Sequence, residues 1–112
     1  MLLAMRTAPL SEARRVAARF HALSDLVRLA IVALLSHQGR CASELERTLD
    51  VTASRLSFHL KVLKRSGLVK ARRNGRWVYY ALEPTTLEEV VAYVELLKPG
   101  TRPDTCALPC CR

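Results

Sequence analysis

Three of the chain's four cysteines, Cys106, Cys110 and Cys111, stand within six residues near its carboxyl end. Thiolates are soft ligands, and three of them match the pyramidal thiolate site that trivalent arsenic and antimony favour, although cadmium, lead and copper(I) also suit sulfur. Pro109 and the short loop from Cys106 to Cys110 lower the entropy of closing such a site. The sequence therefore predicts a metal or metalloid site on a C-terminal tail, residues 101–112.

Other uses of these thiols remain open at this point. Zinc normally takes a fourth ligand, which Cys41 could supply if the fold brings it near the tail. A disulfide within the tail would make it a redox switch, and a tail whose thiols serve nothing is the plainest alternative, because termini are often poorly ordered. A thiol-dependent enzyme, such as an arsenate reductase or transferase, is not expected, because no Cys–His pair, phosphate loop or glycine-rich turn has a suitable spacing.

The rest of the chain has the size and charge of one small basic domain. Its 112 residues, half of them apolar, suffice for one core, and the net charge of +8 favours a polyanionic partner. No apolar run is long enough to span a bilayer, and the apolar stretch at the start of the chain is too short to be the hydrophobic region of a signal peptide. We therefore expect a cytoplasmic protein with no membrane partner, in which structural disulfides are not expected.

Apolar spacing predicts five helices and one β-hairpin, in the order helix–helix–helix–helix–strand–strand–helix. The helices are expected over 11–23, 25–36, 42–49, about 53–66 and about 86–97, with Ser24, Thr52 and Thr85 or Thr86 as N-caps of the second, fourth and fifth. In the second helix, which Gly39 would end, the residues that recur at helical spacing are Leu26, Leu29, Ala30, Ala33 and Leu34. Strands 69–73 and 76–81 flank Asn74-Gly75, a strong hairpin signal. The predicted fold class is mainly α with a β-hairpin (α+β), and the third and fourth helices form a helix-turn-helix.

Charge is segregated along this pattern, because residues 51–82 contain eight Lys and Arg but no Asp or Glu. In the fourth helix, helical spacing turns leucines inward and the following side chains outward: Ser54, Arg55, Ser57, Phe58 and Lys61. Such a helix fits the major groove of DNA, where these groups meet base edges. Arg72, Arg73 and Arg76 flank the hairpin turn, where a narrow minor groove would attract them. Double-stranded DNA is therefore the predicted partner.

These residues resemble the winged helix-turn-helix of the ArsR/SmtB family of bacterial metal-responsive repressors, over about residues 23–97. The motifs that carry the resemblance are LSDLVRL at 23–29, LSFHLKVL at 56–63, SGLV at 66–69 and RNGRWVYY at 73–80. The resemblance makes the hairpin a wing and implies a DNA-binding and dimerisation domain over 1–100. It also implies a homodimer, with the first and last helices packed between protomers, that represses transcription by covering a palindromic operator.

The resemblance also bears on the inducer. Zinc-responsive relatives carry Asp and His ligands on the last helix, where this chain has no histidine between residues 87 and 97. Of the cysteine cluster that other arsenic sensors carry at the third helix, only Cys41 is present, and it can equally be a buried small residue, a cap or a ligand. Further arsenic-responsive members have cysteines at the end of the last helix, which the tail resembles in reverse order. Arsenite or antimonite, bound by Cys106, Cys110 and Cys111, is therefore the implied inducer, with no organic cofactor. A repressor that responds to oxidation, cadmium, lead or zinc is the alternative.

The remaining histidines and aromatic residues are predicted to have structural roles. His59 lies on a helix flank near the core, so we expect packing or backbone positioning and not metal binding. His21 and His37 are isolated in the sequence, and the same expectation applies to them. Trp77 and Tyr80 belong to a strand pattern, which favours packing in the core or the wing over base stacking.

Overall fold

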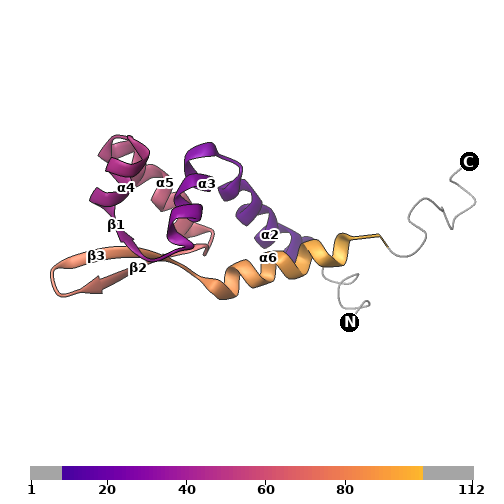
Figure 1. Ribbon diagram of the computed structural model, residues 1–112. Coiled ribbons are helices and arrows are strands. Elements are labelled where there is room, and N and C mark those ends of the chain that lie inside the picture. Colours follow the sequence, from indigo (N-terminus) through magenta and orange to yellow (C-terminus); the bar gives the residue numbers. More distant parts are fainter. Residues whose placement is uncertain (1–8, 100–112) are drawn as a thin grey trace, which may run out of the picture.

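Most of the helices surround one small core, and a three-stranded sheet extends from it (Figure 1). The computed structural model describes residues 9–99. Within this range the elements follow in the order α2 (Pro9–Leu23), α3 (Leu26–Leu35), β1 (Arg40–Cys41), α4 (Ala42–Leu49), α5 (Ala53–Arg65), β2 (Val69–Asn74), β3 (Trp77–Leu82) and α6 (Pro84–Leu97). The predicted fold class, mainly α with a β-hairpin wing, is confirmed, and α4 and α5 form the helix-turn-helix. None of the helices among these residues combines the length and the apolar character that crossing a membrane requires.

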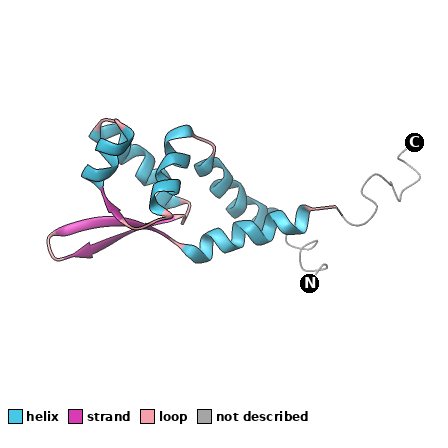
Figure 2. Cartoon of the chain, in the orientation of Figure 1, coloured by secondary structure: helices cyan, strands magenta, loops and turns pink. Residues whose placement is uncertain are grey.

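The wing and the two terminal helices occupy opposite ends of the molecule. Figure 2 shows the β2–β3 hairpin projecting from the helices at one end, whereas α6 leads away from the sheet toward the other. There α6 lies against α2, and each of the two helices contributes a buried valine, Val16 and Val90. Helix α5 sits between these ends and contacts α2, α3, α4 and β2.

The core is built mainly from leucines of the inner faces of the helices. Its fully or nearly fully buried members are Ala22, Ile31, Leu35, Leu45, Leu56, Leu60, Leu63, Leu68 and Val69. In α5 the buried leucines recur at i, i+4 and i+7, which is the spacing that turns one face of a helix inward. Burial of these side chains fixes the rotation of α5 about its axis and so decides which of its residues face outward.

The residues that α3 buries are not those that recur at helical spacing in the sequence. Arg28, Ile31 and Leu35 are buried, while Leu26 is 85% exposed and Leu29 is half exposed. Because the segment is apolar on almost every side, its hydrophobic pattern did not determine which side would meet α2 and α5. The arginine on the inward face is the unexpected result, and it takes part in the polar network described below.

Two predicted helix starts need correction. Asp25, and not Ser24, is the N-cap of α3, because its carboxylate accepts the backbone N–H of Arg28 at 3.1 Å. The last helix begins at Pro84 and not after Thr85 or Thr86; proline suits the first turn because its missing N–H has no helical partner there. Thr52 was predicted correctly, since its hydroxyl accepts the backbone N–H of Arg55 at the start of α5.

The sheet contains a strand that periodicity did not predict. The two-residue strand β1 pairs with β3, through Arg40 with Tyr80 and Cys41 with Tyr79, which gives the order β1-β3-β2. Gly39, predicted to end the preceding helix, instead lies against the Tyr79 ring: a Cβ on this glycine would come within 2.8 Å of that ring. The absence of a side chain at position 39 thus allows β1 to approach β3.

The hairpin turn lies one residue later than predicted. Asn74 pairs with Trp77, so the two loop residues are Gly75 and Arg76. Gly75 has φ +64°, whereas Arg76 does not have a positive φ. Glycine at the first loop position is the choice of type II′ hairpin turns, whose twist matches that of the strands.

Candidate nucleic-acid interface

The outer face of α5 carries every side chain that the sequence placed there. Ser54, Arg55, Ser57, Phe58 and Lys61 are all exposed. They alternate with the inward leucines, which anchor the helix in the core. The helix therefore presents hydroxyl, guanidinium, ammonium and aromatic groups together on one surface, with Phe58 59% exposed among them.

The three arginines assigned to the wing are exposed as well, and the strand register places them around its tip. Arg72 pairs with Tyr79 and Arg73 with Val78, so the two arginines lie on opposite faces of the hairpin. Arg76 occupies the turn itself. The wing therefore carries a cation on each face and one at its end.

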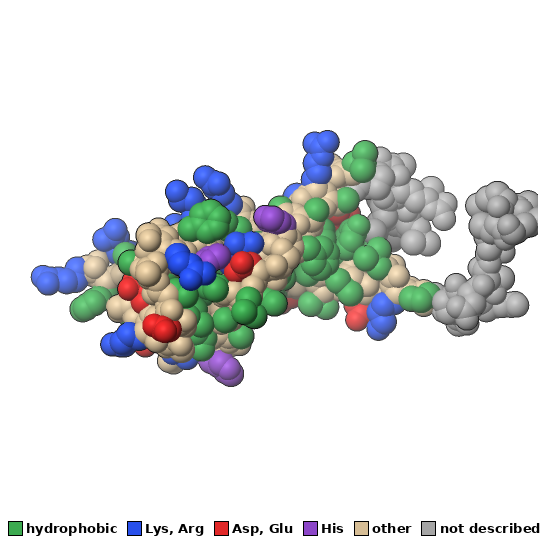
Figure 3. Space-filling model, turned by 90° about the horizontal axis from the view of Figure 1, so that it is seen from above, with side chains coloured by type: hydrophobic (Ala, Val, Ile, Leu, Met, Phe, Trp, Pro, Cys, Tyr) green, Lys and Arg blue, Asp and Glu red, His purple; other side chains and the backbone are tan. Residues whose placement is uncertain are grey.

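Acidic groups are absent from the segment that forms this surface. Residues 51–82 include no Asp or Glu, and Figure 3 shows Lys and Arg side chains projecting at the end of the molecule where the wing lies. At the base of the wing, Lys70 pairs with Glu83 at 3.2 Å. A hydrogen bond from the Thr85 hydroxyl, followed by the contact with Lys70, lowers the pKa of Glu83. Lys70 is therefore engaged within the fold, whereas the wing arginines face solvent.

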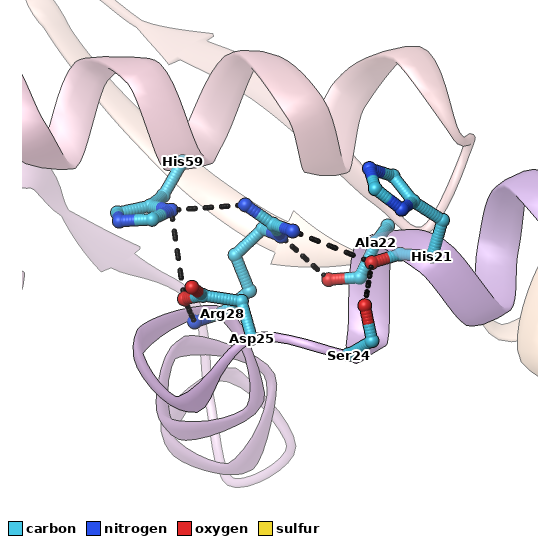
Figure 4. A network of polar contacts seen from close by, with 6 residues as sticks. All are labelled: His21, Ala22, Ser24, Asp25, Arg28 and His59. Atoms are coloured by element: carbon cyan, nitrogen blue, oxygen red, sulfur yellow. Dashed lines mark hydrogen bonds and ion pairs between the residues drawn. The ribbon is translucent and has the colours of Figure 1, made fainter.

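A buried polar network attaches the inner side of α5 to α2 and α3 (Figure 4). Arg28 and His59 are each only 7% exposed. The Arg28 guanidinium donates to the carbonyl oxygens of Ala22 at 2.8 Å and His21 at 3.3 Å, at the C-terminal end of α2. A cation at this end also meets the negative end of the helix dipole.

The same guanidinium reaches His59, one residue after Phe58 of the outer face. Its NH1 atom lies 3.2 Å from Nδ1 of His59. Because guanidinium can only donate, Nδ1 must accept in this contact. A carboxylate oxygen of Asp25 lies 3.7 Å from the same nitrogen. The hydrogen bond that the Asp25 carboxylate accepts from the backbone N–H of Arg28 lowers the pKa of Asp25. The predicted structural role of His59 is confirmed.

The network includes a residue that sequence reasoning left without a role. Arg28 belongs to a motif used for the family resemblance, but its function was not predicted. Its spacing from Ile31 and Leu35 is the available signal, because residues three and seven positions apart lie on one helix face.

The prediction that Trp77 packs in the core or the wing is wrong, since its side chain is 68% exposed at the wing. Tyr80 packs against the core as predicted.

Cys41, the one cysteine among residues 9–99, is half-buried at the start of α4. It is the N-cap residue: its backbone N–H donates to Glu44, and this bond lowers the pKa of that carboxyl. Its sulfur lies 3.2 Å from the Ser43 hydroxyl. No three His, Cys, Asp or Glu side chains in the described range are grouped as a metal site would require. The predicted ligands Cys106, Cys110 and Cys111 lie outside the described residues.

Known proteins are similar to this chain in sequence over the helix-turn-helix. The family described as bacterial regulatory protein, arsR family, matches residues 25–71. An arsenical resistance operon repressor of Escherichia coli (strain K12) is 44% identical over 66 residues, which cover 58% of this chain and 56% of that repressor. The chain thus spans little more than half the length of this relative.

Two further relatives match over longer stretches. An arsenical resistance operon repressor of Bacillus subtilis (strain 168) is 39% identical over 70 residues, which cover 62% of this chain and 67% of that protein. A cadmium resistance transcriptional regulatory protein CadC homolog of Staphylococcus aureus is 35% identical over 77 residues, which cover 68% of this chain and 64% of that protein.

Solved structures share the arrangement of the elements. An ArsR-like transcriptional regulator from Rhodococcus sp. RHA1 has a TM-score of 0.72 at 29% identity, over 76% of this chain and 80% of that chain. A homodimeric winged helix-turn-helix DNA-binding domain from Mycobacterium bovis, described as a possible ArsR-family transcriptional regulator, has a TM-score of 0.61 at 29% identity, over 82% of this chain and 84% of that chain. These relatives and structures are regulators of transcription and not enzymes. The chain itself belongs to the ArsR family of bacterial regulatory proteins.

Proposed function

We propose that the protein binds double-stranded operator DNA and represses transcription. The observation that carries the proposal is the surface of α5 and the wing, where all eight predicted DNA-contacting side chains are exposed within a segment that lacks acidic residues. In the major groove, the exposed groups of α5 can reach base edges. The arginines around the wing tip suit the negative potential of an adjacent minor groove.

The binding species is a homodimer formed through α2 and α6. These two helices, which lie away from the wing (Figure 1), expose several large apolar side chains: Leu10, Phe20, Val91, Val94, Leu96 and Leu97. Exposed apolar side chains on two helices that pack together favour a protein–protein interface, and the related domain from Mycobacterium bovis is homodimeric. Two-fold symmetry then presents two copies of α5 to a palindromic operator, with about 34 Å between half-sites.

The inducer of this repressor is trivalent arsenic or antimony, bound by the thiolates of Cys106, Cys110 and Cys111. Two observations support this assignment: the number and softness of the thiolates, and the arsenical resistance repressors among the relatives. Because the cysteines follow α6 in the sequence, ligand capture can act on the dimer through this helix and change the spacing of the two recognition helices. A coupling free energy of about 1–3 kcal/mol corresponds to a loss of DNA affinity of up to about a hundredfold.

A second candidate signal uses the same thiols. Cadmium is also thiophilic, and a cadmium resistance regulator is among the relatives. Oxidation to a disulfide within the tail would act on the same residues without any metal. These alternatives change the signal and leave the DNA-binding proposal as it stands.

The test is release of DNA by the reduced full-length protein, followed by the fluorescence anisotropy of a labelled duplex. The duplex is selected from a random library by the protein itself. Arsenite, antimonite, cadmium, zinc and a mild oxidant are titrated separately against the wild type, Cys110→Ser and Cys41→Ser. Cys41→Ser is the matched control, because serine is a good N-cap and the three tail thiols remain.

We expect arsenite and antimonite to release DNA from the wild type and from Cys41→Ser, but not from Cys110→Ser. If arsenite released DNA from Cys110→Ser, the tail would not be the arsenite site. Release by cadmium or by oxidant alone would replace the metalloid with the corresponding alternative. Failure of the wild type to bind any selected duplex would contradict the DNA-binding function itself.

A further inference from the structure

The indole of Trp77 is exposed at the tip of the wing. It is 68% accessible to solvent, although tryptophan is highly buried on average. Trp77 is the first residue of β3, directly after the Gly75-Arg76 turn, and it pairs with Asn74 across the hairpin. The wing extends away from the core at this point (Figure 1), so the core does not cover the ring.

The pleat of the hairpin determines what surrounds the indole. Cross-strand partners share a face, and successive residues alternate between faces. Trp77 therefore lies on the face that carries Arg72, whereas Arg73 lies on the other face with Val78. With Arg76 in the turn, the tip presents one large apolar group among three cations, and no carboxylate lies between residues 51 and 82.

We propose that Trp77 contacts DNA directly, its indole packing against the deoxyribose of one minor-groove wall while the neighbouring arginines meet phosphates. The inference rests on the proposed DNA-binding function and adds a residue that was not among the predicted contacts. Sugars line the minor groove and offer apolar surface, whose burial against an exposed indole is favourable. The positive charge of the wing tip is complementary to the negative phosphates on either side of the groove.

A second copy of the chain fits this position less well. The apolar side chains proposed for the dimer belong to α2 and α6, which lie at the opposite end of the molecule from the wing (Figure 1). The three arginines around the indole would also repel the same three arginines of a symmetric partner. Charge complementarity therefore selects a polyanion.

The experiment uses the fact that Trp77 is the chain's only tryptophan, so that its fluorescence reports on this one side chain. Acrylamide quenching of the reduced full-length protein is measured with and without a saturating unlabelled duplex selected from a random library. Anisotropy of the labelled duplex gives the affinity of the wild type, Trp77→Ala and Trp77→Phe. We expect DNA to protect the indole from acrylamide. We also expect about tenfold weaker binding by Trp77→Ala and about threefold weaker binding by Trp77→Phe.

The salt dependence separates a contact from a structural role. Because the indole replaces no counterion, Trp77→Ala should keep the wild-type slope of log Kd against log salt concentration, whereas Arg73→Ala should reduce that slope by about one. A lower slope in Trp77→Ala would mean that the wing had lost its arginine contacts, which would make Trp77 structural and overturn the proposal.

The remaining outcomes are equally decisive. Anisotropy shows independently whether the complex has formed. If acrylamide still quenches the indole fully in that complex, the proposal about Trp77 is overturned and DNA binding stands. Absence of binding by the wild type to every selected duplex would overturn both.

Discussion

The Arg28 guanidinium lies 3.2 Å from Nδ1 of His59, in a contact that joins α3 to the buried side of α5. Because Arg28 also holds the last carbonyls of α2, one buried cation connects three helices. His59 is the link that belongs to α5, and it directly follows Phe58 of the outer face. The orientation of the outer face of α5 thus depends on a polar contact as well as on leucine packing.

We therefore predict that His59→Leu destabilises the fold by about 2 kcal/mol, because a buried guanidinium loses an acceptor. For a domain of this size, that loss lowers Tm by about 10 °C. His59→Asn is the matched variant, since the amide oxygen of asparagine can occupy the place of Nδ1 and accept from Arg28. Thermal unfolding followed by circular dichroism compares the two. Equal losses in both variants would show that ring packing, and not the hydrogen bond, is what matters.

The cap of α3 gives a prediction of pH dependence. The N–H of Arg28 lowers the pKa of Asp25, so this carboxylate stabilises the folded state fully above its ordinary pKa near 4. That contribution is lost as the pH falls through the lowered pKa. Asp25→Ala should therefore be less stable than the wild type at pH 7, and the difference should shrink below about pH 4. Urea unfolding at several pH values measures it.

Asp25→Ser provides the control, because serine also caps helices but does not titrate. We expect it to retain most of the stability at pH 7 and to show a flatter acid limb than the wild type. An unchanged difference between the wild type and Asp25→Ala from pH 7 down to pH 2 would contradict the role of the carboxylate.

Local signals predicted the orientation of α5 well and the non-local contacts poorly. In α5 the leucine spacing, the Thr52 cap and the polar outer row all pointed to one orientation, which the structure has. In α3 the apolar residues surround the helix, so only the packing of α2 and α5 selected the side that carries Arg28. The strand β1 has two residues, and it exists because its partner lies some forty residues further along the chain.

The candidate site shows the same division. Exposure of the outer row of α5 and of the wing arginines followed from periodicity and charge. The exposure of Trp77 did not, because a strand pattern does not show how far a hairpin extends beyond the core that would cover it. The polar link between Arg28 and His59 joins residues far apart in sequence, and no local pattern reveals such a pair.

Arg55, in the first turn of α5, is predicted to read the operator sequence. Its side chain is exposed, and the N-terminal part of a recognition helix contacts base edges in the major groove. Arg55→Ala should weaken binding to the selected duplex about tenfold or more, while binding to a scrambled duplex changes much less. Competition between the two duplexes in the anisotropy assay measures the ratio.

Lys98→Ala is the control for Arg55→Ala, because it removes a cation at the end of α6, far from the wing and already paired with Glu95. We expect it to bind both duplexes as the wild type does. If Arg55→Ala weakened both duplexes by the same factor, Arg55 would be a phosphate contact without a part in sequence recognition.

The dimer prediction concerns the exposed valines of α6. Val91 and Val94 lie three residues apart and therefore on one side of the helix, and both are exposed. Glutamates at both positions would place charge in the apolar interface, so Val91→Glu/Val94→Glu should be monomeric in analytical ultracentrifugation. Its DNA affinity should fall by about a hundredfold, because a monomer loses the second half-site.

Glu88→Gln is the control, because it changes an exposed side chain of the same helix without adding a charge. We expect this variant to stay dimeric. A double variant that remained dimeric would place the interface elsewhere, whereas a monomer with unchanged affinity would show that each protomer binds DNA independently.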